Sequence, residues 1–365
     1  MGMPEINVSF KTLAKTADVR SERGIACIVI KDTTIDGGKY VYTRAKQIKE
    51  NFDEANLSLI KKAFNKYGDS KVVVYVIHQT VADDLGTVTD DETLAEALKK
   101  LNKVEISYMA FNFELKQEDI NVIKTFVEER TANNMDLQVI TNSAVDNEYF
   151  INFVSTGVEI DGVAVEPYRM MCELAFVLSA TPQTQSATYY VFDDVTAVNE
   201  LDDEDKAVDE GKIFITFDGS KYKLSRAVNS KTTLRPDEKQ DIKKIKIVEG
   251  RILVKSDIYK VFRDNYVGKC NNDYNDRLSF VADVNRYLVS LAYEGILNID
   301  YTNRVELDVQ AMRDYMEDEC GIDTTDMKDI DVLKDAEGYC GSKIFIKGQV
   351  RFVDAMEDCD IVLYV

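Results

Sequence analysis

The sequence predicts an α/β and α+β protein: an α/β region with a largely parallel sheet, then a mixed α+β region, with an extended strand at each end of the chain. Three observations support this prediction. Continuous apolar runs of strand length alternate with helical stretches in the first half of the chain. Long helical stretches dominate the second half. Both ends carry short segments of strand character.

Length and composition limit the class of protein. The chain has 365 residues, 45% of them hydrophobic and 30% charged, which predicts a soluble globular protein of two or three domains. The net charge of −20 argues against nucleic acid as a main partner, because phosphate binding needs a basic surface. Residues 1–10 lack a signal-peptide pattern, and no apolar run approaches the ~18 residues of a membrane span. We therefore expect a cytoplasmic origin and no membrane insertion.

The first predicted elements are a strand, a connector and the start of a sheet. Residues 6–11 alternate apolar and polar side chains, which predicts a strand with one buried face, and 12–23 form a polar connector. The runs 25–30 and 72–77 are apolar at every position, as in strands covered on both faces. Between them, 44–67 has helical spacing and ends at Gly68.

The alternation of helix and strand continues through the middle of the chain. Helices are predicted at 91–102 and 117–131, and strands at 106–111 and 137–141. Pro167 suits the first turn of a helix that extends to about Ser179. Further strands are predicted at 189–192, 213–217 and 221–224, the last two joined by a hairpin turn at Asp218 and Gly219.

The remainder of the chain is predicted to be mainly helical, with uneven charge. Helices are expected at 238–267, 273–293 and 307–319, and strands at 343–352 and 361–365. Residues 221–255 contain eleven basic and four acidic side chains, whereas 300–340 contain thirteen acidic and four basic ones. We interpret the basic stretch as an ordinary charged helix face or as a protein–protein surface that meets an acidic one.

No pattern of catalytic or ligand-binding residues emerges. His78 is the only histidine, and no G-x-S-x-G nucleophile elbow accompanies it that could supply the serine of a catalytic triad. We therefore expect a structural role for His78. The six cysteines are scattered and are expected to be buried thiols in a reducing compartment. Asp202, Asp203, Glu204 and Asp205 lack calcium-loop spacing and predict a solvated helix N-terminus. We expect no catalytic residue, cofactor or metal.

The two chain ends are the most informative feature. Unpaired apolar strands at chain ends normally invite aggregation, so they favour strand addition to a neighbouring copy. The side chains expected in such contacts are Ile6, Val8, Phe10, Ile361, Val362, Leu363, Tyr364 and Val365. If donor and acceptor surfaces differ, contacts propagate into a ring or helix. The alternative is that both strands fold back onto their own subunit.

Several segments, in this order, resemble contractile tail sheath proteins, most closely the short sheaths of defective prophages and R-type bacteriocins of Gram-positive bacteria. They begin with Ile6–Phe10 and Arg23–Ala26 and continue with Leu178–Pro182, Arg226–Ser230, Lys244–Glu249 with Asp257 and Ile258, Tyr266–Lys269 and Asp354–Asp358.

The resemblance implies four regions. Residues 1–22 would be an arm strand and linker, and 23–225 an outer α/β region, which is subtilisin-like in longer relatives. Residues 226–353 would be the inner sheath domain and 354–365 a C-terminal arm strand. In related sheaths such arms join strands in adjacent subunits.

The resemblance also implies a function. A sheath polymerises, in stacked hexameric rings, around an inner tube from the baseplate, and it contracts to drive the tube through a cell envelope. The expected partners are further copies, the tube, the baseplate and the tail terminator, in a virion or phage-tail-like particle assembled in the bacterial cytoplasm. For contact with the tube we favour the acidic helix with Asp308, Arg313, Asp314, Glu317 and Asp318 over the basic stretch.

Two other functions stay open at this point. One is an α/β enzyme with an unrecognised site, and the other is a non-contractile scaffold or capsid-associated protein. Helical tubes or rings of purified protein would distinguish a sheath from both.

Overall fold

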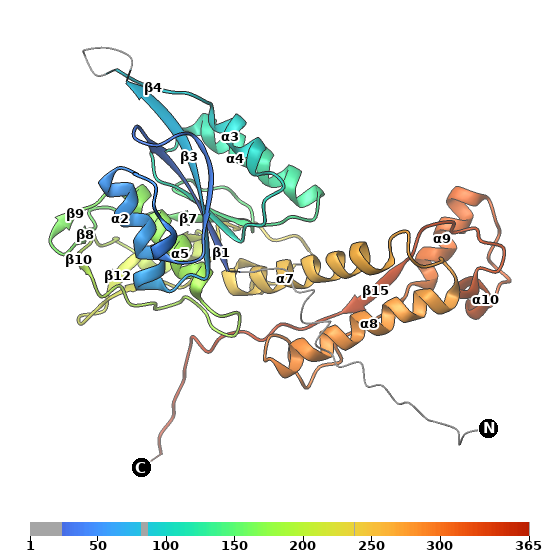
Figure 1. Ribbon diagram of the computed structural model, residues 1–365. Helices are drawn as coiled ribbons and strands as arrows, with labels where there is room; N and C mark the ends of the chain where they lie inside the picture. The colour runs from blue at the N-terminus through green and yellow to red at the C-terminus, as the bar shows by residue number, and fades with distance from the viewer. Residues whose placement is uncertain (1–23, 82–86, 237, 365) are drawn as a thin grey trace, which may run out of the picture. The chain divides into compact units, whose positions relative to one another are not determined.

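The fold was analysed in a computed structural model that describes residues 24–81, 87–236 and 238–364 (Figure 1). The predicted N-terminal strand with Ile6, Val8 and Phe10, and the last residue Val365, lie outside the described residues. Contacts divide the chain into two compact units. One is Lys255–Arg351, and the other contains the described residues up to Val254 together with those from Phe352 onward.

The larger unit is built on an eight-stranded, largely parallel sheet. Its strands follow the order β11-β7-β6-β5-β1-β3-β2, with β4 paired to β3. Strands β2 and β4 run antiparallel to β3, and the other pairs are parallel. The bounds are β1 Ile25–Asp32, β2 Gly38–Tyr42, β3 Lys71–Val81, β4 Val88–Asp90, β5 Tyr108–Phe111, β6 Gln138–Thr141, β7 Phe150–Phe153 and β11 Lys212–Ile213. The predicted fold class, with its largely parallel sheet, is confirmed, but the strand predicted at 361–365 is not: residues 361–364 are exposed and belong to no strand of the described chain.

Helices cover both faces of this sheet, which explains its continuously apolar strands (Figure 1). Helices α2 (Glu54–Lys62) and α5 (Pro167–Ala180) pack on one face, and α3 (Leu94–Leu101) and α4 (Gln117–Ala132) pack on the other. A capping box between Thr93 and Glu96 starts α3. The predicted helices 91–102, 117–131 and 167–179 are thus confirmed.

Two local predictions were wrong. The helix expected at 44–67 begins only at α2, after a short 3₁₀ turn at Ala45–Gln47, because the carboxylate of Asp53 caps the backbone N–H of Asn56. It then continues as a π turn, Ala63–Tyr67. The strand expected at 189–192 is reduced to one bridge, Val191 with Lys223, since Tyr189 has a φ of 60° that interrupts extended backbone.

Smaller elements complete this unit. The predicted hairpin is present as β12 (Ile215–Phe217) and β13 (Tyr222–Leu224). Strands β8 (Glu159–Ile160), β9 (Val163–Ala164) and β10 (Val195–Ala197) form a separate small sheet. Helix α6 (Glu204–Asp209) follows the acidic run, and the Asp203 side chain caps it, as predicted.

The second unit is mainly helical, and α7 (Ile245–Val261) leads the chain into it. A 3₁₀ turn, Gln240–Lys243, precedes α7 and a π turn, Phe262–Tyr266, follows it. The unit then contains α8 (Tyr274–Tyr293), β14 (Arg304–Leu307), α9 (Val309–Cys320), α10 (Asp329–Lys334) and β15 (Ile346–Gln349). Met312 and Met316 of α9 pack with Val332 and Cys340 in its core.

The predicted strand 343–352 is shorter than expected. It is reduced to β15 because Lys343 closes a turn onto the carbonyl of Cys340, while the carbonyl of Arg351 accepts from the Asn298 N–H. The two compact units divide after Val254 and after Arg351, and not at the predicted boundary between residues 225 and 226. That predicted division concerned layers of an assembled sheath, and it stays a prediction.

Candidate assembly surfaces

The C-terminal segment is tied to the α/β unit by charge. Lys244 pairs with Asp354 and, at 3.4 Å, with Glu357, while Arg226 pairs with Asp358 and, at 3.8 Å, with Glu357. The Glu357 side chain is only 6% exposed. We call these five residues the C-terminal clasp. Burial disfavours the ammonium of Lys244, but hydrogen bonding to Asp354 and the charge of Glu357 raise its pKa overall.

Neutral contacts reinforce the clasp. The hydroxyls of Thr188 and Ser186 donate to Glu357 at 2.6 and 3.1 Å. Beside it, the Phe352 ring lies against Gly250, where an added Cβ would stand 2.8 Å from the ring. Glycine at position 250 therefore lets the C-terminal segment lie close to α7.

Beyond the clasp the chain carries an exposed apolar run. Ile361, Val362, Leu363 and Tyr364 are 73%, 72%, 83% and 94% exposed and belong to neither helix nor strand. Four consecutive apolar side chains with such exposure are unusual on a soluble protein and are typical of an unoccupied contact segment. We call residues 359–364 the C-terminal tail.

The hairpin of β14 and β15 has two unlike edges. On β14, the Asn285 side chain donates to the carbonyl of Val305 at 3.0 Å and accepts from its N–H at 2.7 Å. This amide occupies the outer edge of β14 as a strand would. Within the described part of the chain, β15 pairs with β14 alone. Among the described residues, the outer edge of β15 is therefore the one without a partner strand.

The predicted acidic helix is α9, and its charged residues serve two different purposes. Asp308 caps α9 and pairs with Lys347 at 3.5 Å, whereas Arg313 binds the carbonyls of Thr324 and Met327 and the carboxylate of Asp329. Glu317 accepts from the Thr324 hydroxyl. Asp314 and Asp318 are exposed, one turn apart, on the same side of α9. These two are the predicted residues most available to a partner.

The basic stretch 221–255 is largely paired with acidic groups of the α/β unit. Besides the clasp, Lys223 pairs with Asp218, Lys231 with Glu238 and Arg251 with Glu148. This stretch thus binds acidic side chains of the chain's own C-terminal segment, and the protein–protein surface expected there stays a prediction. The sequence signal was available, since three acidic residues lie between positions 354 and 358.

The residues considered for chemistry have structural environments. The His78 ring donates through Nδ1 to the carbonyl of Ile35 at 2.7 Å. Burial raises the pKa of Cys27 to about 12 and that of Cys340 to about 11. Cys270 and Cys359 are exposed, which corrects the expectation that all thiols are buried. Among the residues that the structure describes, no cluster of histidine, cysteine or acidic side chains has the arrangement of a metal site.

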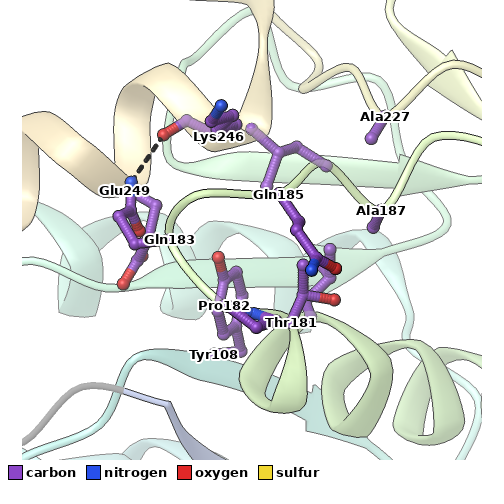
Figure 2. Close-up of a pocket in the computed structure, with 11 residues that line it drawn as sticks. Tyr108, Thr181, Pro182, Gln183, Gln185, Ala187, Ala227, Lys246 and Glu249 are labelled. Carbon is purple, nitrogen blue, oxygen red and sulfur yellow. Dashed lines mark hydrogen bonds between the residues drawn. The ribbon is translucent and has the colours of Figure 1, made fainter. Parts of the chain in front are cut away.

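The α/β unit contains a small cavity that Figure 2 shows in close-up. A cavity of about 20 Å³ lies among Tyr108, Thr181, Gln183, Ala227 and Glu249, and Gln183 donates across its rim to the carbonyl of Lys246 at 3.1 Å (Figure 2). It has room for about one water molecule. Within the described ranges, no helix has the length and apolarity to cross a bilayer.

Comparison with known proteins then gave consistent matches. Residues 237–359 match the family model described as the phage tail sheath C-terminal domain. The tail sheath protein of Clostridium phage phiCD119 is 29% identical over 372 residues, which cover 99% of this chain and 98% of that protein.

Solved structures share the fold. Two sheath tail proteins, from Listeria innocua and Desulfitobacterium hafniense, are each 14% identical, with TM-scores of 0.65 and 0.66. The match to the Listeria protein covers 81% of this chain and 92% of that protein. The match to the Desulfitobacterium protein covers 84% of this chain and 94% of that protein. The helical sheath of the anti-feeding prophage in its contracted state is 14% identical, has a TM-score of 0.66 and matches 100% of this chain and 99% of its own.

Proposed function

We propose that this chain, which belongs with the phage tail sheath proteins, is the repeating subunit of a contractile sheath whose copies are linked by exchanged strands. Its relatives are structural sheath proteins and not enzymes. The sheath would assemble in the bacterial cytoplasm, in stacked hexameric rings around an inner tube, between a baseplate and a tail terminator. On contraction it would drive the tube through the target envelope.

The observation that carries strand exchange is the exposed C-terminal tail. The clasp holds the chain to its own α/β unit as far as Asp358, and four apolar side chains follow without cover. A strand in an adjoining copy would bury them and supply partners for their backbone groups. The clasp would then keep the departure point of the tail fixed while the tail serves the neighbour.

The acceptor is the outer edge of β15. Asn285 occupies the outer edge of β14, so an added strand would instead pair with the backbone groups of Ile346 and Gly348 of β15, which no other described strand pairs. The N-terminal segment with Ile6, Val8 and Phe10 is proposed to act as a second exchanged strand.

Magnitudes support a linkage that survives contraction. Each strand hydrogen bond stabilises by a net 0.5–1.5 kcal/mol, roughly, and each buried large apolar side chain adds about 1.5–3 kcal/mol. The free energy of several such hydrogen bonds and buried side chains exceeds ~1 kcal/mol. A contraction free energy of about that size per subunit would suffice when it is summed over many copies. Subunit bodies can then rotate and slide as near-rigid units while the strands stay paired.

Contact with the tube is proposed for the exposed face of α9. Asp314 and Asp318 offer negative charge on one turn of helix, which suits a breakable, solvated interface. Asp308, Arg313 and Glu317 would act by holding α9 and the loop after it in place. The tube would carry complementary positive charge.

Electron microscopy of purified protein tests this function. The full chain is expected to form helical tubes or rings, and deletion of 359–365 is expected to leave a folded monomer. Deletion of 1–20 should likewise abolish the polymer. A compact small oligomer with both deletions tolerated would contradict the proposal and favour an enzyme.

A further inference from the structure

The unit Lys255–Arg351 contains a groove of about 580 Å³. Three aromatic rings, Phe262, Tyr266 and Phe280, line it and pack on one another with centroids 4.9–6.5 Å apart. Val267 and Ile344 add further apolar surface. A volume of this size is typical of sites that bind a ligand or a peptide segment.

The C-terminal tail of a second copy has the right chemistry for this groove. Leu363 and Tyr364 are the most exposed of the four apolar side chains of the tail, at 83% and 94%. An aliphatic and an aromatic side chain are suited to an aromatic-lined groove, where offset or edge-on ring contacts add about 0.5–1.5 kcal/mol to apolar burial.

The position of the groove along the chain also fits. Ile344, which lines it, lies two residues before β15. A strand added antiparallel to the open edge of β15 uses about four residues to span Ile346–Gln349 and then passes Ile344. The residues beyond Asp358 provide this length, so a strand that starts at position 359 brings Leu363 and Tyr364 to the groove.

Charge favours the same occupant. Exposed Lys269 and Lys343 adjoin the lining residues Gly268, Cys270, Ser342 and Ile344. The tail follows Asp358 and includes Asp360, so it carries negative charge. The acidic residue in the lining, Asp276, is already engaged, because its side chain accepts from the backbone N–H of Asn271.

We infer that the groove of Phe262, Tyr266, Val267, Phe280 and Ile344 receives Leu363 and Tyr364 from the C-terminal tail of a second copy. This inference rests on the proposed strand exchange and adds the pocket that fixes the register of the exchanged strand. A strand on a two-stranded hairpin could slip by two residues, and a side-chain pocket at its end prevents that.

Cross-linking in assembled protein tests the inference with a native thiol. Cys270 lines the groove, so Leu363→Cys in a Cys359→Ser background places a second thiol at the proposed contact. Mild oxidation, or a short bismaleimide reagent, is expected to give a ladder of covalent multimers with Cys270 joined to position 363. The matched control adds Cys270→Ser and should give no ladder.

The outcomes separate the two levels of the proposal. Polymers without this cross-link, under either reagent, overturn the groove assignment and leave strand exchange standing. A cross-link confined to single chains, which migrates as a monomer, also overturns it. Failure of the unmodified chain to polymerise under any condition overturns the proposed function itself.

A substitution at an exposed residue of the groove provides a second test, because it should not disturb the packing of the hydrophobic core. Val267 is 54% exposed, so Val267→Glu should leave the fold intact and place a charge in the groove. We expect the concentration needed for polymerisation to rise at least tenfold. Val289→Glu, at a 49% exposed position of α8 outside the groove, should leave it unchanged. Equal effects of the two substitutions contradict the inference.

Discussion

At the scale of single residues, the clasp shows how an acidic chain holds its own acidic end. Glu357 is almost fully covered, yet two cations and two hydroxyls surround it. A buried carboxylate without such partners would cost several kcal/mol, roughly, so the pairing defines where the C-terminal tail departs. Arg226 and Lys244 thus organise the tail without belonging to it.

Removing one cation of the clasp should loosen the segment 354–358 with little effect elsewhere. Lys244→Ala is expected to speed amide hydrogen exchange there and to lower the free energy of unfolding by about 1 kcal/mol, since partly exposed pairs contribute little. The neighbouring Lys243→Ala serves as the control. Unchanged exchange at 354–358 in the Lys244 variant would show that the clasp does not hold the segment.

Asp69 should make stability depend on pH. Burial raises the pKa of its carboxyl to about 8, although the Ser179 hydroxyl donates to it and opposes the shift. The unfolded chain ionises near pH 3.9, roughly, so the folded protein retains a proton that the unfolded chain has lost. Its contribution to stability is present below about pH 4 and is lost as the pH rises toward about 8.

Asp69→Asn should remove this dependence. The melting temperature of the variant is expected to fall less steeply than that of the unmodified chain between about pH 5 and about pH 8. Scanning calorimetry at several pH values measures both slopes. Parallel slopes would mean that Asp69 is ionised throughout this range.

At the scale of elements, the success of sequence patterns followed from burial. Strands β1 and β3 are covered on both faces, and a continuous apolar run of six residues predicts that directly. Helix α6 was predicted from its acidic start because capping is local chemistry. The prediction of a strand at 189–192 was wrong, because the positive φ of Tyr189 leaves no signal in a sequence of β-prone residues.

The candidate site was only partly predictable for the same reason. The apolar run at the C-terminus can be read from the sequence, and so can the opposite charges of the basic stretch and residues 354–358. The hydrogen bond between the Asn285 side chain and Val305 of β14 cannot be read from the sequence, because it is a tertiary contact between positions 20 residues apart. The groove likewise joins segments from 262 to 344 that no local pattern connects.

The strand character of the tail is testable with one substitution. Val362→Pro removes a backbone N–H and is expected to abolish polymerisation while leaving the monomer's melting temperature unchanged, since Val362 is 72% exposed. Val362→Thr keeps a β-branched side chain and should still polymerise. Sedimentation of the polymer measures both. Normal assembly of the proline variant would exclude a paired strand at this position.

At the scale of the whole molecule, charge separates two kinds of contact. The net charge of −20 keeps free subunits apart, and strand exchange must overcome that repulsion at short range. Contact with a tube can instead use the charge. A sheath that must release its tube on contraction gains from an interface that water and salt weaken.

Reversing the charge on α9 should therefore affect only assembly on the tube. Asp314→Lys with Asp318→Lys is expected to reduce tube-templated assembly at least tenfold, whereas tube-free polymers should form normally. Asp202→Lys with Asp205→Lys, at the start of α6 in the other unit, is the matched control. Unchanged templated assembly in the α9 variant would remove this helix from the proposed interface.

The structure of the assembled polymer by electron cryomicroscopy tests strand exchange most directly. The account predicts continuous density in which residues 359–362 of each copy lie hydrogen-bonded along β15 of an adjoining copy, with Leu363 and Tyr364 just beyond it. Density that returns these residues to a strand of their own subunit, in the polymer as well as in the free protein, would contradict it.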